Sequence, residues 1–166
     1  MGRIKRIIVH WTAGTNQPNN VDYEHYHYLI NSDGLIIKGK YKPEDNLNCY
    51  DGKYAAHTGG GNTGSIGVAL CGMFGFSSRK QVGKYPLTKI QCEKCFELIA
   101  KLCKDYGIQI SPDTVMTHYE FGKKNPKTSS AGKIDIIYLP PYPQVADNEV
   151  GDFIRQKAKW YYINKS

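Results

Sequence analysis

The sequence predicts an α/β fold in which a mixed central β-sheet is flanked by helices. Three patterns favour it: a β-branched run at residues 3–11, an unbroken apolar run at residues 65–72, and an amphipathic stretch at residues 86–107. An unbroken apolar run is typical of a strand buried on both faces, and the amphipathic stretch supplies a helix that packs on the sheet. The chain of 166 residues is long enough for one core, so we expect one domain over residues 1–166.

The amino-terminal half is predicted to form the first strands of the sheet. Residues 3–11 (RIKRIIVHW) precede a turn-rich segment, which indicates an interior strand that ends at His10. Residues 25–41 contain two apolar runs around Ser32-Asp33-Gly34, and the Asp-Gly pair favours the positive φ of a tight turn. We therefore expect a β-hairpin there. The run SIGVALCG at residues 65–72 predicts a further strand, at the buried centre of the sheet.

The carboxy-terminal half is predicted to add two helices and one strand. Residues 86–107 place apolar side chains on one face at helical spacing. Thr88 and Gln91 have the spacing of a capping box at the start of this helix, and Gly107 is a typical stop at its end. The remaining expected elements are a strand at residues 114–119, a loop at residues 120–132 and a helix at residues 148–161.

The net charge of +7 indicates attraction to a polyanion, such as a nucleic acid, an anionic membrane or a bacterial cell wall. Charge alone does not choose among them. A nucleic-acid-binding domain is a candidate because thirteen tyrosines accompany the charge, but no nucleic-acid motif supports it, so no nucleic-acid partner is expected. The apolar runs are too short for a signal peptide or a membrane span, so we expect cytoplasmic synthesis without a signal peptide and no membrane insertion.

The cysteines do not indicate a disulfide framework. The chain has five, an odd number, which suits a reducing compartment of synthesis. Cys92 and Cys95 have a CxxC spacing, but they fall inside the predicted amphipathic helix and no second ligand pair accompanies them. We therefore expect both side chains to lie in the core.

Two histidines and one aspartate could form a metal site. His10 and His118 lie near the ends of predicted strands, and Asp135 follows a flexible loop. Two histidines and a carboxylate suit catalytic zinc, because three protein ligands leave a fourth position open for water. On the residues alone an alternative stays open, in which His10 is hydrogen-bonded to backbone and Asp135 is a loop or N-cap carboxylate.

Four segments, IIVHWTAG, HYHYLINSDG, AAHTGGGNTGSIGVALCG and VMTHYEF, follow one another along the chain. In this order they resemble the N-acetylmuramoyl-L-alanine amidases related to phage lysozymes and peptidoglycan recognition proteins. The resemblance covers nearly the whole chain. It implies the fold of that family and zinc-dependent hydrolysis of the amide between the muramoyl lactyl group and L-alanine in bacterial peptidoglycan.

The resemblance also implies the ligands of the zinc ion. His10 matches the zinc-binding histidine of the first strand, and His118 matches the histidine that ends the later strand. The A-C-P or A-x-P-G-D context that often carries the third ligand is absent. The segment GKIDI instead resembles a phage subgroup in which the aspartate is the ligand, so the resemblance implies Asp135.

Three further residues match functional positions of the family. Tyr26 matches a tyrosine that orients water or transfers a proton, Lys133 a lysine that stabilises the oxyanion, and His57 a histidine that lines the substrate cleft. Without the resemblance, Tyr26 would simply fill a half-buried strand, and Lys133 and His57 would be solvated loop residues. Strand alternation predicts that His25 and His27 point to the face opposite Tyr26.

The expected cellular role is that of a phage or prophage endolysin, which acts on the cell wall after release. The expected partner is bacterial peptidoglycan, and the protein is expected to be a monomer. Two alternatives keep the fold: a non-catalytic peptidoglycan-binding recognition module, and a cytoplasmic amidase that recycles wall fragments. A tail-associated hydrolase would have a similar sequence.

Overall fold

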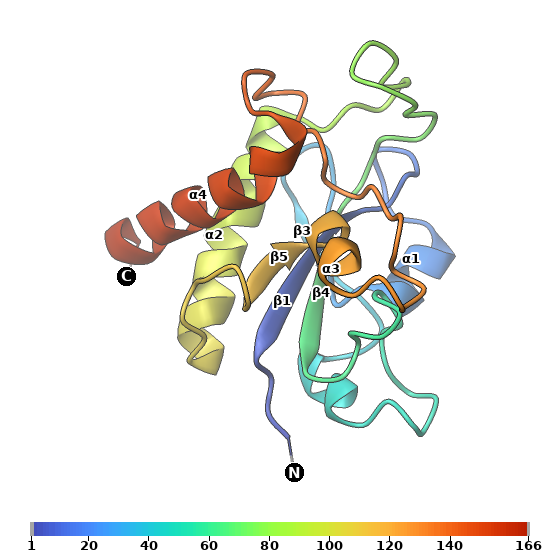
Figure 1. The fold of residues 1–166 in the computed structure, drawn as a ribbon, viewed down its shortest axis with the longest axis vertical. Helices are drawn as coiled ribbons and strands as arrows, with labels where there is room; N and C mark the ends of the chain where they lie inside the picture. The colour runs from blue at the N-terminus through green and yellow to red at the C-terminus, as the bar shows by residue number, and fades with distance from the viewer. Residues whose placement is uncertain (1, 166) are drawn as a thin grey trace.

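A computed structural model describes residues 2–165. Its five-stranded sheet has the strand order β3-β2-β4-β1-β5 (Figure 1). Strands β2, β4, β1 and β5 run parallel to one another, whereas β3 is antiparallel to β2. The predicted mixed sheet is therefore confirmed. The strands are β1 (Arg6–Trp11), β2 (Tyr28–Ile30), β3 (Ile36–Lys38), β4 (Ser65–Leu70) and β5 (Val115–Thr117).

The centre of the sheet brings two distant histidines together. All six residues of β4 are buried, as its unbroken apolar run predicted. Strand β1 lies between β4 and β5, and its register pairs Val9 with Thr117. The next residues, His10 and His118, consequently lie side by side at the carboxyl ends of parallel strands. This edge of an open α/β sheet is where ligands commonly bind.

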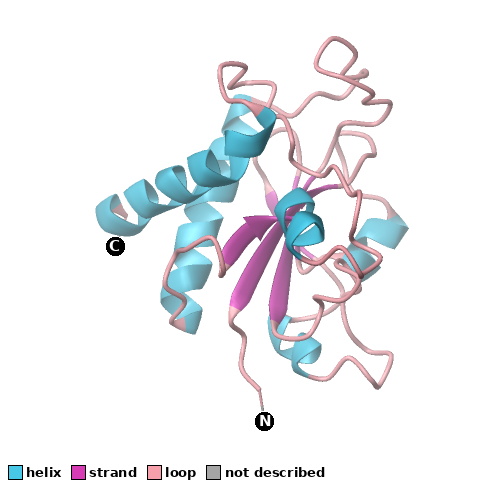
Figure 2. Ribbon diagram, viewed as in Figure 1, coloured by secondary structure: helices cyan, strands magenta, loops and turns pink. Residues whose placement is uncertain are grey.

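Four α-helices surround the sheet, and α2 and α4 pack side by side (Figure 2). Over residues 2–165, none of the helices has the length and apolar character that crossing a bilayer requires. The helices are α1 (Asn20–His25), α2 (Lys89–Tyr106), α3 (His118–Lys124) and α4 (Val150–Asn164), with short 3-10 helices at Pro43–Leu47 and Asp147–Glu149.

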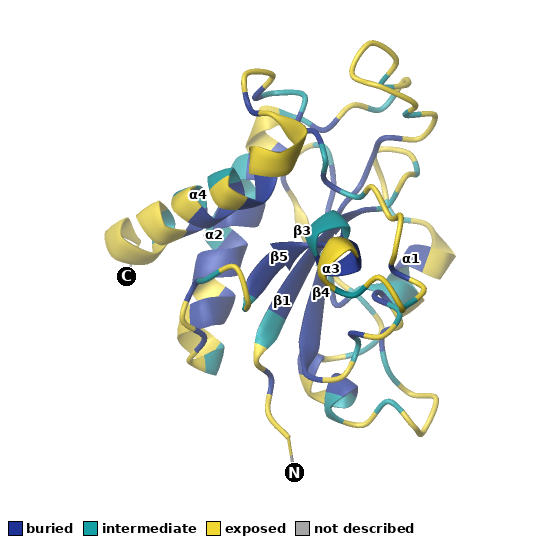
Figure 3. Cartoon of the chain, viewed as in Figure 1, coloured by how far each residue is buried: buried dark blue, intermediate teal, exposed yellow. Residues whose placement is uncertain are grey.

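The side chains of β1 alternate between two layers of the molecule. Ile7 and Val9 join the main core, which also contains the buried sides of α2 and α4 (Figure 3). Ile8 points to the opposite face and packs with Phe121 of α3. Because side chains two residues apart share a face of a strand, His10 lies on the same side as Ile8. The ring of His10 therefore faces away from the main core and toward α3.

The long helix α2 follows its sequence prediction closely. Thr88 accepts a hydrogen bond from the Gln91 backbone and closes a capping box, and Gly107 adopts the left-handed conformation with φ of 65° at the other end. The buried Gln91 amide donates to the carbonyl oxygens of Ile30 (2.8 Å) and Cys71 (2.9 Å), which ties the helix to the sheet. Cys92 and Cys95 are buried in the core, as expected.

Two short α-helices, α1 and α3, were not predicted. Helix α1 lies just before the hairpin, and α3 begins at His118, inside the strand expected at residues 114–119. The strand prediction is therefore wrong for residues 118–119, and the loop prediction is wrong for residues 120–124. Both helices begin with a capping box, Asn19 with Asp22 and Thr117 with Glu120. Because each box satisfies backbone N–H groups at the helix start, it stabilises helices that are too short to show an apolar period.

Candidate metal centre and its cavity

Three side chains converge at the carboxyl ends of β1 and β5. The Nδ1 atoms of His10 and His118 are 3.1 Å apart. Asp135 Oδ2 lies 3.1 Å from His10 Nδ1 and 3.2 Å from His118 Nδ1. Ligand atoms that lie ~2.0–2.1 Å from a tetrahedral zinc ion are about 3.3 Å from one another. The three atoms are therefore spaced nearly as zinc ligands would be.

The hydrogen bonds of His118 show which of its nitrogens is free to bind a metal. Its Nε2 lies 3.0 Å from the Ser130 hydroxyl oxygen, and that hydroxyl donates its hydrogen to the Gly59 carbonyl oxygen at 2.7 Å. Because the Ser130 hydrogen is already used, Nε2 of His118 must be the donor. The neutral ring then has its lone pair on Nδ1, which points toward His10 and Asp135.

The ionisation of the other two side chains also suits a metal. Burial is the main reason that the pKa of His10 falls to about 4, although the neighbouring Asp135 acts in the opposite direction. Burial would raise the pKa of Asp135, but its contacts with His10 and His118 outweigh this effect and lower it. At neutral pH the site therefore offers a neutral imidazole and a carboxylate beside His118. Such a buried His-His-Asp trio could bind a metal ion such as zinc.

A strained backbone turn presents Asp135 to the histidines. The next residue, Ile136, has a φ of 68°, a left-handed conformation that costs an L-residue ~1–2 kcal/mol. Its side chain is completely buried in the main core, and the Asp135 carbonyl accepts a hydrogen bond from Tyr119 N at 3.4 Å. Packing of Ile136 in the main core thus offsets the strain. The turn directs the Asp135 carboxylate away from that core, toward His10 and His118.

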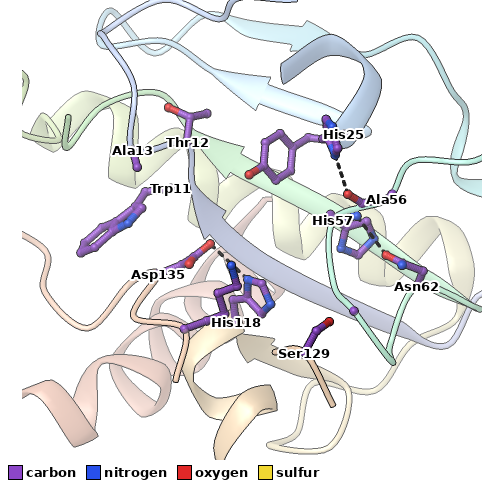
Figure 4. A pocket seen from close by; sticks show the side chains of 13 residues that line it. Trp11, Thr12, Ala13, His25, Ala56, His57, Asn62, His118, Ser129 and Asp135 are labelled. Carbon is purple, nitrogen blue, oxygen red and sulfur yellow. Dashed lines mark hydrogen bonds and ion pairs between the residues drawn. The ribbon is translucent and has the colours of Figure 1, made fainter. Parts of the chain in front are cut away.

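Two members of this trio, His118 and Asp135, line a cavity of about 500 Å³, whereas His10 is fully buried. His118 and Asp135 lie side by side in it, across from His57 and Asn62 (Figure 4). Among the described residues that line it, Asp135 is the only acidic one. If Asp135 binds a metal, no second carboxylate of the lining remains to act as a general base.

Both residues predicted to take part in catalysis line the same cavity. The ring of Tyr26 lies 5.2 Å from that of His10 between centroids. Burial raises the pKa of Tyr26, so its phenol keeps its proton at neutral pH. Lys133 is exposed to solvent at the cavity wall, two residues before Asp135. The structure therefore brings these two residues to the trio, and their catalytic roles stay predictions.

The predicted placement of the histidines around Tyr26 is wrong for one of them. His25 lines the same cavity as Tyr26, whereas His27 is buried and contacts Asn46. Alternation fails because His25 is the last residue of α1 and Tyr26 caps that helix, so neither belongs to the strand. His25 is a cavity residue that the sequence reasoning missed, and the Asn19 capping box was the signal that could have revealed it.

His57 lies at the cavity but turns its ring nitrogens inward. Its exposure is only 7%. Nδ1 lies 3.1 Å from His10 Nε2, and Nε2 lies 3.3 Å from the Ser65 carbonyl oxygen. Its role in binding substrate stays a prediction. His57 is a direct neighbour of His10 within the protein interior.

Comparisons with known proteins agree with this architecture. The family profile described as N-acetylmuramoyl-L-alanine amidase matches residues 1–132, a range that includes His10 and His118 and ends before Lys133 and Asp135. A search of curated proteins found no match.

Solved structures share the fold at low sequence identity. The Staphylococcus aureus hydrolase AmiA, solved in complex with its ligand, has a TM-score of 0.59 at 17% identity, covering 98% of this chain and 75% of its own. A mutant form of PlyL has a TM-score of 0.54 at 23% identity, covering 95% of this chain and 85% of its own. At these identities the likeness concerns the fold alone.

Proposed function

Because the chain belongs to the N-acetylmuramoyl-L-alanine amidase family, we propose that it is a zinc-dependent hydrolase of bacterial peptidoglycan. The bond that it cleaves is the amide between the muramoyl lactyl group and L-alanine. Cleavage there detaches stem peptides from the glycan strands. The observation that carries this proposal is the convergence of the ligand atoms of His10, His118 and Asp135, of which His118 and Asp135 line one cavity.

In this proposal the three side chains hold the metal, and each is suited to it by its surroundings. His118 offers Nδ1 because Ser130 engages its Nε2, and Asp135 supplies one negative charge. Zinc held there would supply Lewis acidity toward water and a carbonyl group. The open cavity above the trio leaves room for a substrate carbonyl to approach.

Lys133 and Tyr26 would act on the reacting groups directly. The Lys133 ammonium group would stabilise the negative charge that develops on the carbonyl oxygen. The Tyr26 hydroxyl keeps its proton and could orient the attacking water or pass a proton during the reaction. Because the described residues of the cavity lining include no carboxylate besides Asp135, proton transfer falls to groups such as the Tyr26 hydroxyl.

We also propose an endolysin-like role at the cell wall. The net charge of +7 supports it, because a basic protein is attracted to the carboxylates and phosphates of a bacterial wall. A recycling amidase would prefer soluble wall fragments to intact walls. A recognition module would bind the wall without cleaving it, and the retained trio of metal-binding side chains argues against that alternative.

Release of stem peptides tests the proposed function. Protein loaded with one equivalent of zinc is incubated with purified, insoluble peptidoglycan, and the soluble products are sequenced by mass spectrometry. We expect peptides with a free amino-terminal L-alanine, no release after chelation, and recovery when zinc is restored. Peptides with a different amino terminus would refute the assigned bond. Binding to the wall without release would favour the recognition module, and activity confined to soluble fragments would favour recycling.

Tyr26→Phe tests the role of the tyrosine hydroxyl. We expect peptide release to slow by about 100-fold, the lower end of the effect of one acid–base group, with zinc content unchanged. Tyr28→Phe is the matched control, because Tyr28 lies on β2 and is not among the residues that line the cavity. A Tyr26→Phe protein that releases peptides at the wild-type rate would exclude a catalytic role for this hydroxyl.

A further inference from the structure

His57 connects the central strand to one of the candidate metal ligands. Its Nδ1 lies 3.1 Å from Nε2 of His10 and 2.7 Å from the Thr58 hydroxyl oxygen. On the other side of the ring, its Nε2 lies 3.3 Å from the carbonyl oxygen of Ser65, the first residue of β4. Both ring nitrogens are thus engaged inside the protein.

These contacts determine which nitrogens carry hydrogen. The Ser65 carbonyl oxygen can only accept, so His57 Nε2 must donate to it, and the Nδ1 of the neutral ring must then accept. Two groups face that Nδ1, the Thr58 hydroxyl at 2.7 Å and His10 Nε2 at 3.1 Å, and the same hydroxyl oxygen lies 3.3 Å from His10 Nε2. Because the Nδ1 lone pair faces His10 Nε2 and the hydroxyl oxygen can also accept, His10 Nε2 carries the hydrogen. The lone pair of His10 is left on Nδ1, the atom that faces His118 and Asp135.

We propose that His57 is a positioning residue that holds His10 in the orientation and tautomer required to bind a metal. This inference rests on the proposed zinc site. Hydrogen bonds to the second nitrogen of a histidine ligand fix its ring and raise its basicity, and removing the partner commonly lowers metal affinity by about 10–100-fold. Ser130 makes the equivalent contact to His118, so each histidine of the trio has its own partner.

A glycine on β4 makes room for the His57 ring. A Cβ atom on Gly67 would lie 2.5 Å from His57 Cγ, closer than any real contact. The ring therefore lies directly on the backbone of the central strand. Any side chain at this position would displace His57 from His10, which provides a way to disturb the contact without altering the histidine itself.

A buried polar network fixes the backbone of His57. The N–H groups of His57 and Thr58 donate to the Asn62 side-chain oxygen at 2.9 and 2.8 Å. The fully buried Asn46 donates in turn to the Asn62 carbonyl oxygen at 3.1 Å. Asn46 also contacts His27 Nε2 at 2.9 Å, and His27 Nδ1 accepts from the backbone of β4. The loop that carries His57 is thus connected to the sheet at two places.

The test compares variants that differ in hydrogen-bonding capacity at this position. His57→Phe keeps a ring but has no acceptor, whereas His57→Gln keeps a side-chain oxygen that can accept from His10. Zinc affinity is measured by competition with a chromophoric chelator, and the visible spectrum of the cobalt-substituted protein reports the ligand geometry. We expect affinity to fall about 10–100-fold in His57→Phe and in Gly67→Ala, and only a few-fold in His57→Gln.

His25→Gln is the matched control, because it changes another cavity histidine, whose Nδ1 bonds to the Ala56 carbonyl oxygen at 2.7 Å, and it should keep the wild-type zinc affinity. Wild-type affinity in His57→Phe would overturn the inference, as would equal losses in His57→Phe and His57→Gln, which would indicate a packing role.

Nitrogen-15 spectra of the zinc-loaded wild type show which histidine nitrogens carry hydrogen. This test does not depend on whether the variants fold. A hydrogen on His10 Nε2 and none on His57 Nδ1 are expected, and a hydrogen on His57 Nδ1 would overturn the inference. Wild-type protein that binds zinc but releases no peptides would refute the proposed function alone. The zinc affinities of the variants would then still decide whether His57 positions His10. Failure of the wild type to bind zinc would refute both.

Discussion

Asp135→Ala is expected to lose its zinc and to release stem peptides at least about 1,000-fold more slowly than the wild type. The expected loss of rate follows from the several kcal/mol that a metal ion contributes to stabilising charge in the transition state. Each ~1.4 kcal/mol corresponds to a factor of ten in rate. Asp135 supplies the only negative charge of the trio, and its carboxylate lies within 3.2 Å of both histidine nitrogens. Zinc per chain by elemental analysis and peptide release are measured on the same preparations.

Two further variants separate metal loss from other effects of this substitution. Asp135→Cys places another zinc-binding group at the same position and should retain the metal. Asp113→Ala removes a carboxylate that is 91% exposed in its side chain and is not among the described residues that line the cavity, so it should change neither measurement. An Asp135→Ala protein that keeps one zinc ion and full activity would show that Asp135 is not a ligand.

The sheet and the long helices could be predicted because their residues carry their own signals. The unbroken apolar run of β4 indicated burial on both faces, and all six of its residues are buried. In α2, the apolar face, the Thr88 cap and the terminal Gly107 all agree, so local and global preferences coincide. The proposed ligands were found from motif order, and the parallel pairing of β1 with β5 brings two of them together.

The parts that escaped prediction depend on short helices or on contacts between distant segments. Helix α1 has six residues, which is too short to show an apolar period, and only its Asn19 cap marks it. Ser130 lies in a segment rich in Gly, Lys and Ser, where nothing in the sequence distinguishes it from its neighbours. Its importance emerges only when folding places its hydroxyl between His118 and Gly59.

The contacts of His57 likewise could not be predicted from the sequence. The motif containing His57 indicated a residue near substrate, and its place at the cavity agrees with that. The inward direction of both ring nitrogens follows from the approach of its loop to β4, across the Gly67 backbone. A glycine in a strand is a recognisable sign of close approach, but the sequence does not say which group approaches.

A partly buried ion pair holds α3, and with it His118, against the rest of the protein. Arg155 of α4 donates to both carboxylate oxygens of Glu120 at 2.9 and 3.0 Å and to the Val115 carbonyl oxygen at 2.9 Å. The same Glu120 carboxylate closes the capping box by accepting from Thr117 N at 3.0 Å. One guanidinium group therefore connects α4, β5 and the start of α3, whose first residue is His118.

Arg155→Met is expected to lower the free energy of unfolding by about 3 kcal/mol, the lower end of the range for breaking a buried pair. The lower end applies because the Glu120 side chain retains 24% exposure and can partly rehydrate. Methionine keeps most of the apolar volume but leaves the Glu120 charge and the Val115 carbonyl oxygen without their partner. Urea denaturation of zinc-loaded protein, with Lys159→Met as an exposed control on the same helix, measures the change. A loss below about 1 kcal/mol, the value typical of surface pairs, would mean that this cluster does not support α3.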